Sequence, residues 1–376
     1  PTAARADRDA AWELAGQEAV QRIRVETGPL VQAVLGDMGQ AGQWLAIAIH
    51  HLGVDQVSWF TLIADLEWAL AGRLDMFGPA PSYLAWSADQ PQRATSPGVE
   101  AAAAFWSAQL EELGTDGETA DAGTEADSER LLVRLPAGET HPLIHGAHDT
   151  YHATPLDVLC AALTAAYSHW AAEPCLRLAL ESNGRAGSGA WSGAVGWFTA
   201  VYPVVLPVSR DPGATLAMVK DRLRAVPDDG SFGLLRYLHP TWSKRLLRSP
   251  EPPLSLNYLA RLDPQPAMGR VLRPLPQDSF LARGPQVRRG HRLEVTVLII
   301  NDALVAEFCW NGRHDSRAAV LALADRFLNE LRRLARHLTE HGGPGLTPSD
   351  FVHVDLDARE LGAILAEVTK TPDDPH

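Results

Sequence analysis

Residues 114–129 set the first limit on the fold, because they divide the chain into two parts that must each build a core. The segment reads GTDGETADAGTEADSE, holds six acidic residues and contains no large apolar side chain. Such a stretch cannot bury enough surface to become ordered against a core. We therefore expect an acidic linker at 114–129, an N-terminal lobe at 1–113, a C-terminal lobe at 130–350 and a tail at 351–376.

Hydrophobic periodicity predicts irregularly alternating helices and strands on both sides of this linker, as in a mixed α/β protein. Residues 11–35 indicate a helix, a break at Gly28-Pro29 and a strand. Further helices are predicted at 57–70, 99–113, 155–170 and 317–341, and in the first of them Asp65 and Glu67 fall opposite the apolar face. Strands are predicted at 44–50, 130–135, 175–181 and 201–208, with a hairpin of 292–300 and 303–310 turning at Asn301-Asp302.

Composition excludes several classes of function. The 376 residues include 33 basic and 46 acidic side chains without a basic stripe, which is unfavourable for nucleic-acid binding. No apolar run reaches the ~20 residues that cross a bilayer. The three cysteines, Cys160, Cys175 and Cys309, form no CxxC pair, which argues against disulfides and cysteine zinc sites and favours the cytoplasm. Because the chain begins at Pro1 without Met, we expect a piece of a longer protein.

The most distinctive local pattern is His50-His51-Leu52-Gly53-Val54-Asp55, at the end of a predicted strand and the start of a helix. A histidine there can face a cleft and act as a general base near neutral pH. Asp55 is placed to hold the loop through an arginine or a backbone amide. Packed strand-end histidines are the alternative, and no third ligand at a convincing spacing supports a metal site.

A second histidine group, His141, His145, His148 and His152, has the spacing of one helix face. Pro142 and Gly146 argue against a stable helix, and no carboxylate or cysteine completes a ligand set. We interpret this segment as a polar approach to the helix that begins at Pro155, with no metal.

Three further segments carry candidate site residues. Glu181 leaves an apolar strand, where burial can make a carboxylate a better proton carrier, although pairing with Arg185 or Arg177 is an equal alternative. Residues 193–199 (GAVGWFT) indicate a close backbone crossing followed by aromatic anchoring, or core packing alone. Asn257-Tyr258 could donate hydrogen bonds to an oxyanion.

Taken in order, these segments resemble the epimerization domains of nonribosomal peptide synthetases, which belong to the condensation-domain superfamily. The similar segments are HHLGVDQVSW at 50–59 (HHxxxDGxSW), LDVLCAAL at 156–163, ESNGR at 181–185 (EGHGRE), VGWFTAVYP at 195–203 (VGWFTxxYP), PDDGSFGLLRY at 227–237 (PxxGxGYGxLRY), LNYL at 256–259 (FNYLG) and TPSDF at 347–351. HHxxxD alone occurs in many acyltransferases. The VGWFTxxYP form favours epimerization over condensation.

The chain also departs from the family pattern. The opening segment with its PxQxWF motif is absent, so the resemblance implies an incomplete, N-terminally truncated first lobe. The single-residue departures are Gln56 for Gly after the Asp of HHxxxD, Asn183 and Ala186 for His and Glu of EGHGRE, and Ala260 for Gly after NYL. The family's two proton-transfer residues are retained as His51 and Glu181.

The resemblance implies two chloramphenicol-acetyltransferase-like α/β lobes that form a V-shaped pseudo-dimer with a central tunnel. An upstream peptidyl carrier protein would present an aminoacyl or peptidyl thioester on phosphopantetheine, with no cofactor bound to the chain itself. His51 and Glu181 would invert Cα by removing and returning its proton, with Asn257 or Tyr258 supporting the enolate oxygen. The structural residues at the site would be His50, Asp55, Arg185 and Trp197.

The implied activity is that of an isomerase, and two alternatives stand beside it. One is a condensation domain that forms the peptide bond, with His51 positioning the attacking amine. The other is an inactive docking module, which the departures at Gln56 and Asn183 favour. A condensation domain is the expected downstream neighbour, and neither nucleic acid nor membrane is an expected partner.

Overall fold

The computed structural model describes residues 2–114, 122–185, 190–262, 271–272, 283–340, 345–351 and 359–361. The chain forms two compact units. The first comprises Pro1–Gln90, Asn183–Thr199 and Pro264–Val287, and the second comprises Pro91–Ser182, Ala200–Asp263 and Arg288–His376. The first unit is therefore built from three separate segments of the chain, and no local pattern predicted this.

These units do not follow the lobe boundaries expected from the sequence. The helix α4 (Pro97–Leu113) belongs to the second unit, where it packs against strand β5 (Ala200–Pro207). Residues 115–121 of the predicted linker lie outside the described residues, and its last two residues already belong to strand β3 (Ser128–Leu135). Most of the predicted tail, 352–358 and 362–376, also lies outside them.

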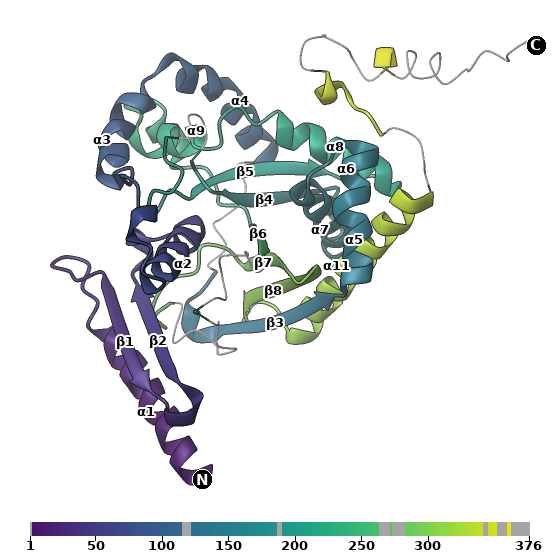
Figure 1. The fold of residues 1–376 in the computed structure, drawn as a ribbon. Helices are drawn as coiled ribbons and strands as arrows, with labels where there is room; N and C mark the ends of the chain where they lie inside the picture. The colour runs from purple at the N-terminus through teal and green to yellow at the C-terminus, as the bar shows by residue number, and fades with distance from the viewer. Residues whose placement is uncertain are drawn as a thin grey trace, which may run out of the picture. The chain divides into compact units, whose positions relative to one another are not determined.

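A six-stranded sheet forms the centre of the second unit, in the order β3-β8-β7-β6-β4-β5 (Figure 1). Its other strands are β4 (Cys175–Ser182), β6 (Leu254–Leu262), β7 (Leu293–Ile300) and β8 (Ala303–Asn311). β6 runs parallel to both β4 and β7, and the remaining pairs are antiparallel. The two prolines of β5, Pro203 and Pro207, lie on an edge strand, where a missing amide hydrogen is tolerated.

The predicted hairpin is confirmed. Ile300 of β7 pairs directly with Ala303 of β8, so the turn consists of two residues. Both turn residues, Asn301 and Asp302, have positive φ angles of 50° and 62°. This is the geometry of a type I′ turn, which Asn and Asp tolerate better than other side chains.

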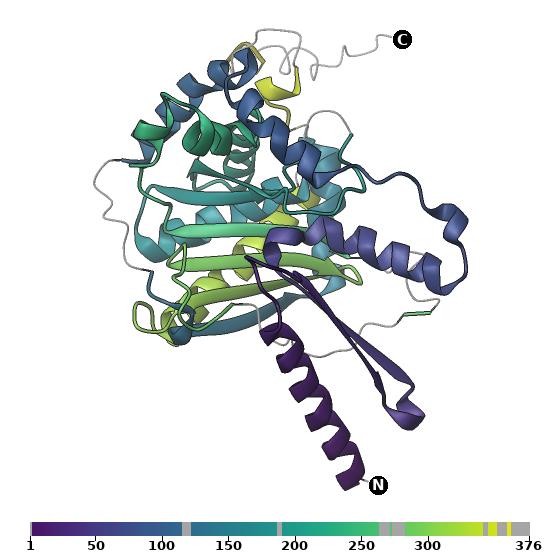
Figure 2. The same cartoon turned by 90° about the vertical axis from the view of Figure 1, so that its left-hand side faces the viewer.

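Three long helices bury their apolar faces against one face of this sheet (Figures 1 and 2). They are α7 (Pro155–Ala171), α8 (Pro212–Arg224) and α11 (Arg317–Glu340). α7 begins with a capping box between Thr154 and Asp157 and has Pro155 in its first turn, as helix starts favour. α11 presents apolar residues at helical spacing, among them the fully buried Leu323 and Phe327.

The first unit contains a hairpin of β1 (Val31–Asp37) and β2 (Gln43–Ile49) beside helix α1 (Thr2–Gln21). Trp12 of α1 packs edge-on against Trp44 of β2, with ring centroids 5.6 Å apart. After β2 come helix α2 (Gln56–Leu70) and helix α3 (Tyr83–Ala94), whose last residues cross into the second unit. α3 is absent from the predicted elements.

The prediction for Glu67 is wrong. Asp65 is exposed as expected, but Glu67 is only 4% exposed. Its two carboxylate oxygens accept hydrogen bonds from the backbone amides of Val271 and Leu272, at 3.1 and 2.8 Å. The contact is with a segment about 200 residues away, so helical spacing alone could not reveal it.

The described residues contain no helix that is both long and apolar enough to cross a membrane.

The remaining short helices of the second unit are α5 (Ala137–His141), α6 (Ala147–Tyr151), α9 (Ser231–Gly233) and α10 (Ser243–Leu246).

Candidate functional site

The tandem histidines lie directly after β2, in a single helical turn. His50 caps this turn, His51–Gly53, by accepting a hydrogen bond from the backbone amide of Leu52 at Nδ1 over 3.2 Å. His51 packs edge-on against the indole of Trp197, with ring centroids 5.3 Å apart. The two histidines therefore have different surroundings, the first in a backbone turn and the second beside an aromatic ring.

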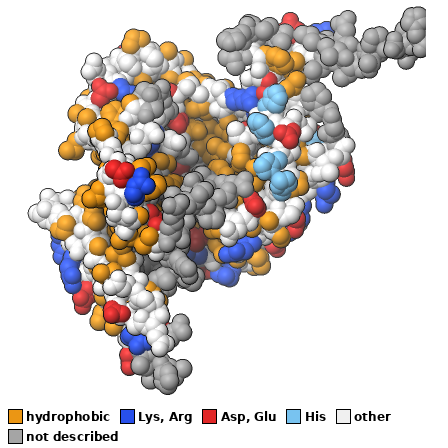
Figure 3. All heavy atoms as spheres, in the orientation of Figure 1, with side chains coloured by type: hydrophobic (Ala, Val, Ile, Leu, Met, Phe, Trp, Pro, Cys, Tyr) orange, Lys and Arg blue, Asp and Glu red, His pale blue; other side chains and the backbone are white. Residues whose placement is uncertain are grey.

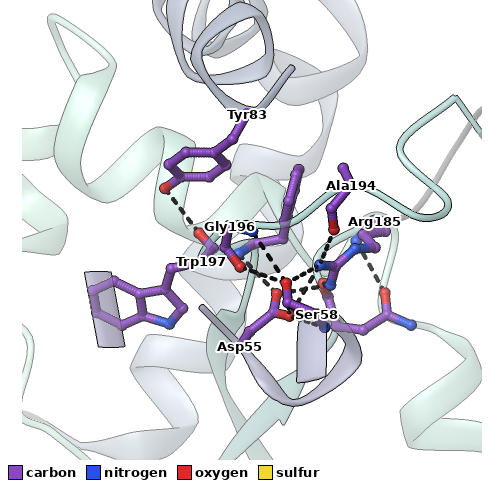
Figure 4. Close-up of polar contacts among 9 residues, drawn as sticks. Asp55, Ser58, Tyr83, Arg185, Ala194, Gly196 and Trp197 are labelled. Carbon is purple, nitrogen blue, oxygen red and sulfur yellow. Dashed lines mark hydrogen bonds and ion pairs between the residues drawn. The ribbon is translucent and has the colours of Figure 1, made fainter. Parts of the chain in front are cut away.

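Asp55 is the centre of a buried polar network in the first unit (Figure 4). It caps α2 by accepting from the amide of Ser58 at 2.8 Å. Its two carboxylate oxygens accept a fork of hydrogen bonds from Arg185, at 2.7 and 2.9 Å, and one oxygen also accepts from the amide of Phe198 at 3.0 Å. The carboxylate thus joins the start of α2 to Arg185 and to the backbone of Phe198.

This network determines the ionisation of Asp55. Burial alone would raise the pKa of its carboxyl group. The hydrogen bonds from Arg185, Ser58 and Phe198 outweigh that effect and hold the pKa below its ordinary value. Asp55 is therefore charged at neutral pH, and its carboxylate holds Ser58, Arg185 and Phe198 together by hydrogen bonds.

Ser58 is a site residue that sequence reasoning missed. Its fully buried hydroxyl lies 2.7 Å from Asp55 and 3.0 Å from the carbonyl oxygen of Gly196, and accepts from the amide of Gly196 at 3.1 Å. It also accepts from Arg185 at 3.0 Å. Ser58 lies in the segment similar to HHxxxDGxSW, although no role was predicted for it, and its position three residues after the helix cap at Asp55 is a second local signal.

Arg185 is held on several sides. It donates to the carbonyl oxygen of Ala194 at 3.1 Å, and its guanidinium carbon lies 4.2 Å from the ring centroid of Phe198. Asn183 accepts from the backbone amide of Arg185 at 2.9 Å and so forms the turn that leads to it. The ion pair that the structure shows for Arg185 is with Asp55.

Glu181 and Asn257 lie side by side in the second unit. Leu180 of β4 is in register with Leu256 of β6, and the strands are parallel, so the next residues of both strands are neighbours. The side-chain amide of Asn257 donates to a carboxylate oxygen of Glu181 at 2.7 Å. The ion pair of Arg177 is with Glu173, at 3.7 Å.

Tyr258 lies on the opposite face of β6 from Asn257. Successive residues of a strand point to opposite faces, and Tyr258 packs against the core on the same face as Leu254 and Leu256. The structure therefore brings Asn257, and not Tyr258, to Glu181. An oxyanion role for either residue stays a prediction.

The second histidine group occupies a helical segment, contrary to the sequence interpretation. α5, a π-helical turn at Pro142–Gly146 and α6 follow one another without a break. Pro142 is the first residue of the π-helical turn, so the hydrogen-bonding pattern of the helical segment changes at the proline. His141, His145, His148 and His152 are all exposed, and histidines gather over α5 and α6 in Figure 3. Within the described residues no group of three or more metal-binding side chains could hold an ion.

The two units thus offer two kinds of chemistry. The first holds His51, a potential proton carrier, on a loop stabilised by a buried ion pair. The second holds a carboxylate at a strand end, oriented by an amide. Groups of this type transfer protons to and from carbon acids or activate nucleophiles.

Comparison with known proteins identifies the family. The condensation domain family matches residues 2–352. Bacitracin synthase 3 of Bacillus licheniformis is 31% identical over 353 residues, covering 89% of this chain and 5% of that protein. Surfactin synthase subunit 2 of Bacillus subtilis (strain 168) is 31% identical over 360 residues, covering 91% of this chain and 10% of that protein. The chain therefore spans only a small part of these relatives.

Solved structures support the same assignment. The epimerization domain from the third module of tyrocidine synthetase B has a TM-score of 0.75 and 26% identity, covering 88% of this chain and 77% of that one. The X-domain from teicoplanin biosynthesis, with a TM-score of 0.63 and 18% identity over 88% of this chain and 76% of that one, shares the fold. The chain therefore belongs to the condensation domain family, within the superfamily of nonribosomal peptide synthetase domains that its motifs indicated.

Proposed function

We propose that this chain is an isomerase that epimerizes the Cα of an aminoacyl or peptidyl thioester, from L to D, in nonribosomal peptide biosynthesis. The observation that carries the proposal is the pairing of Glu181, near the end of β4, with Asn257 of the adjacent parallel strand β6. It supplies an oriented carboxylate in addition to the histidine of HHxxxD. Similarity to a solved epimerization domain supports the same reaction.

The chemistry of inversion explains why two groups are needed. A thioester acidifies the Cα–H, but the enolate remains unfavourable at neutral pH without a placed base and support for its oxygen. One group removes the proton from one face of Cα, and a second group returns a proton to the other face. We assign these roles to Glu181 and His51, in an order that depends on the direction of the reaction.

The other site residues position these two groups. Asn257 holds one oxygen of Glu181 and thereby fixes the direction of the carboxylate that carries the proton. Asp55 and Arg185 hold the loop that follows β2 and bears His51. Neither residue exchanges a proton in the proposed reaction, because their ion pair is buried and its hydrogen bonds hold the pKa of Asp55 below its ordinary value.

The proposed substrate arrives on a partner. An upstream peptidyl carrier protein would present the thioester on its phosphopantetheine arm, and a condensation domain would use the product downstream. The relatives are peptide synthases far longer than this chain, which is consistent with neighbouring domains. The chain itself would need no bound cofactor, because the thioester supplies the acidity.

Peptide-bond formation is the second candidate, and the matching of the condensation domain family favours it. In that reaction His51 would position the attacking amine of an acceptor substrate. It requires two loaded carrier proteins and no exchange of the Cα proton, so the two reactions can be separated by experiment.

Deuterium wash-in tests the proposal. A carrier protein loaded with an L-aminoacyl or L-peptidyl thioester is incubated with this chain in D₂O, and the released acid is analysed by chiral chromatography and mass spectrometry. We expect Cα-deuterium and a mixed L/D product, which Glu181→Gln and His51→Ala each suppress. The matched variants Glu111→Gln and His145→Ala change exposed residues and should retain exchange.

Two results would contradict the proposal. Absence of label while the carrier still binds would identify a docking module. Dipeptide formed after addition of an acceptor carrier, without exchange at Cα, would identify a condensation enzyme.

A further inference from the structure

The backbone of residues 196–198 is hydrogen-bonded to side chains of two helices within the first unit. At the start of α2, the hydroxyl of Ser58 contacts the amide and the carbonyl oxygen of Gly196. The carboxylate of Asp55 accepts a hydrogen bond from the amide of Phe198. On the α3 side, the hydroxyl of Tyr83 donates to the carbonyl oxygen of Trp197 at 3.0 Å (Figure 4). The peptide that carries the Trp197 side chain is thus held from both directions.

The ring of Tyr83 is itself fixed by packing. It stacks on Trp86 with ring centroids 5.3 Å apart and meets Phe198 edge-on at 5.1 Å. It also covers Gly196 so closely that a Cβ there would lie 2.3 Å from the ring. Burial, followed by the charge of Asp55, raises the pKa of Tyr83, so its hydroxyl stays protonated and acts as a donor.

The Trp197 indole connects this packing to His51. Trp197 is 39% exposed, so its ring is only partly enclosed by other side chains. Its position therefore depends strongly on its own backbone, which Tyr83 holds. The indole meets the imidazole of His51 edge-on, at 5.3 Å between centroids and 64° between planes.

We infer that Tyr83 is a positioning residue for His51: by holding the carbonyl of Trp197, it fixes the indole against which the imidazole lies. The consequence for catalysis rests on the proposed epimerase function. The positioning itself does not, because every contact in it lies within the first unit.

The positioning is tested by NMR of the full chain with ¹³Cε1-labelled histidine. The resonance missing from His51→Ala identifies His51. Trp197→Ala should shift it, since the ring current of the indole is lost, and Tyr83→Phe should shift it in the same direction by a smaller amount. Leu84→Ala, at an exposed neighbour of Tyr83, should leave it unchanged.

A His51 resonance that stays in place in Tyr83→Phe, while Trp197→Ala moves it, would overturn the inference. So would a resonance that neither variant moves. Tyr83→Phe keeps the ring that covers Gly196 and removes only the hydroxyl, so the variant should fold.

Exchange kinetics test the consequence. Tyr83→Phe should lower kcat for Cα exchange by about three- to tenfold, the scale of one hydrogen bond, with little change in KM. In a Trp197→Ala background the same change should cost no further activity, because the connecting ring is gone. An equal loss in both backgrounds would indicate a merely structural role. If the unmodified chain shows no exchange, the proposed function fails, while the NMR result still decides the role of Tyr83.

Discussion

Asn257 donates a hydrogen bond of 2.7 Å to Glu181, and this contact joins two residues that are 76 positions apart in the chain. It follows from the parallel register of β4 and β6, which pairs Leu180 with Leu256 and so makes the next residue of each strand a neighbour of the other. A carboxylate held through one oxygen has a defined orientation. The pair is therefore a candidate for proton transfer whose carboxylate is oriented by a neighbouring strand.

Replacing Asn257 by Ala should lower the rate of Cα exchange by about 10- to 100-fold, the value of a hydrogen bond to a charged group. The loss should appear in kcat more than in KM, because Asn257 orients a proton carrier. Single-turnover wash-in measures it. Asn329→Ala, an exposed residue of α11, is the matched control, and a rate equal to that control would show that Glu181 needs no orientation.

Asp55→Asn should lower the free energy of unfolding at neutral pH by about 3–5 kcal/mol, because it leaves Arg185 buried without its counter-charge. The native pKa of Asp55 lies below its ordinary value of 3.8, so the native state favours the charged form. Its contribution is therefore fully present above pH 3.8 and disappears as the pH falls through the lower native pKa. Urea unfolding should show the difference from the unmodified chain narrowing below pH 3.8, and a constant difference would contradict this account.

Glu67→Gln should destabilise the chain by about 1–3 kcal/mol, since a neutral amide can replace only part of what a carboxylate offers to two backbone amides. Asp65→Asn provides the control, because this exposed residue was expected to share the environment of Glu67. Chemical unfolding of both variants measures the difference. Equal effects would mean that the contacts with Val271 and Leu272 contribute no net stability.

Lys220→Met should cost about 3–5 kcal/mol in stability, because Lys220 is fully buried and donates to Asp350 at 2.7 Å and to the carbonyl oxygen of Tyr151 at 2.6 Å. Asp350 should keep part of its charge compensation in this variant, because Arg224 also donates a hydrogen bond to it at 2.6 Å. Lys244→Met, at an exposed lysine, should be nearly neutral. Thermal unfolding compares the two, and similar melting temperatures would show that the buried pair is dispensable.

Some elements could be predicted because their causes are local. The turn at Asn301-Asp302 follows from the positive φ angles that these residues tolerate, and the strands on either side follow from alternation. α11 follows from apolar spacing over 24 residues. The helical turns at 137–151 were missed because Pro142 and Gly146 argued against a stable helix, and no element was predicted over α3, a helix that contains Pro91.

The candidate site divides in the same way. The motifs identified His51, Asp55, Glu181 and Asn257 by resemblance to a family. Tyr83 lies in no motif, and its contact with Trp197 spans 114 positions. Ser58 lay within a recognised motif, but its contact with Gly196 spans 138 positions and has no local signal.

By itself, the sequence determined several of the helices and strands and the tight turn at Asn301-Asp302, because backbone preference and apolar spacing act over a few residues. It also carried the motifs of the condensation domain family. Only the tertiary structure decided that Asp55 binds Arg185, 130 positions away, and that Asn257 and not Tyr258 faces Glu181. The physical reason is that strand register and chain crossings choose among many polar partners, and a buried charge must pair with whichever one the fold brings near.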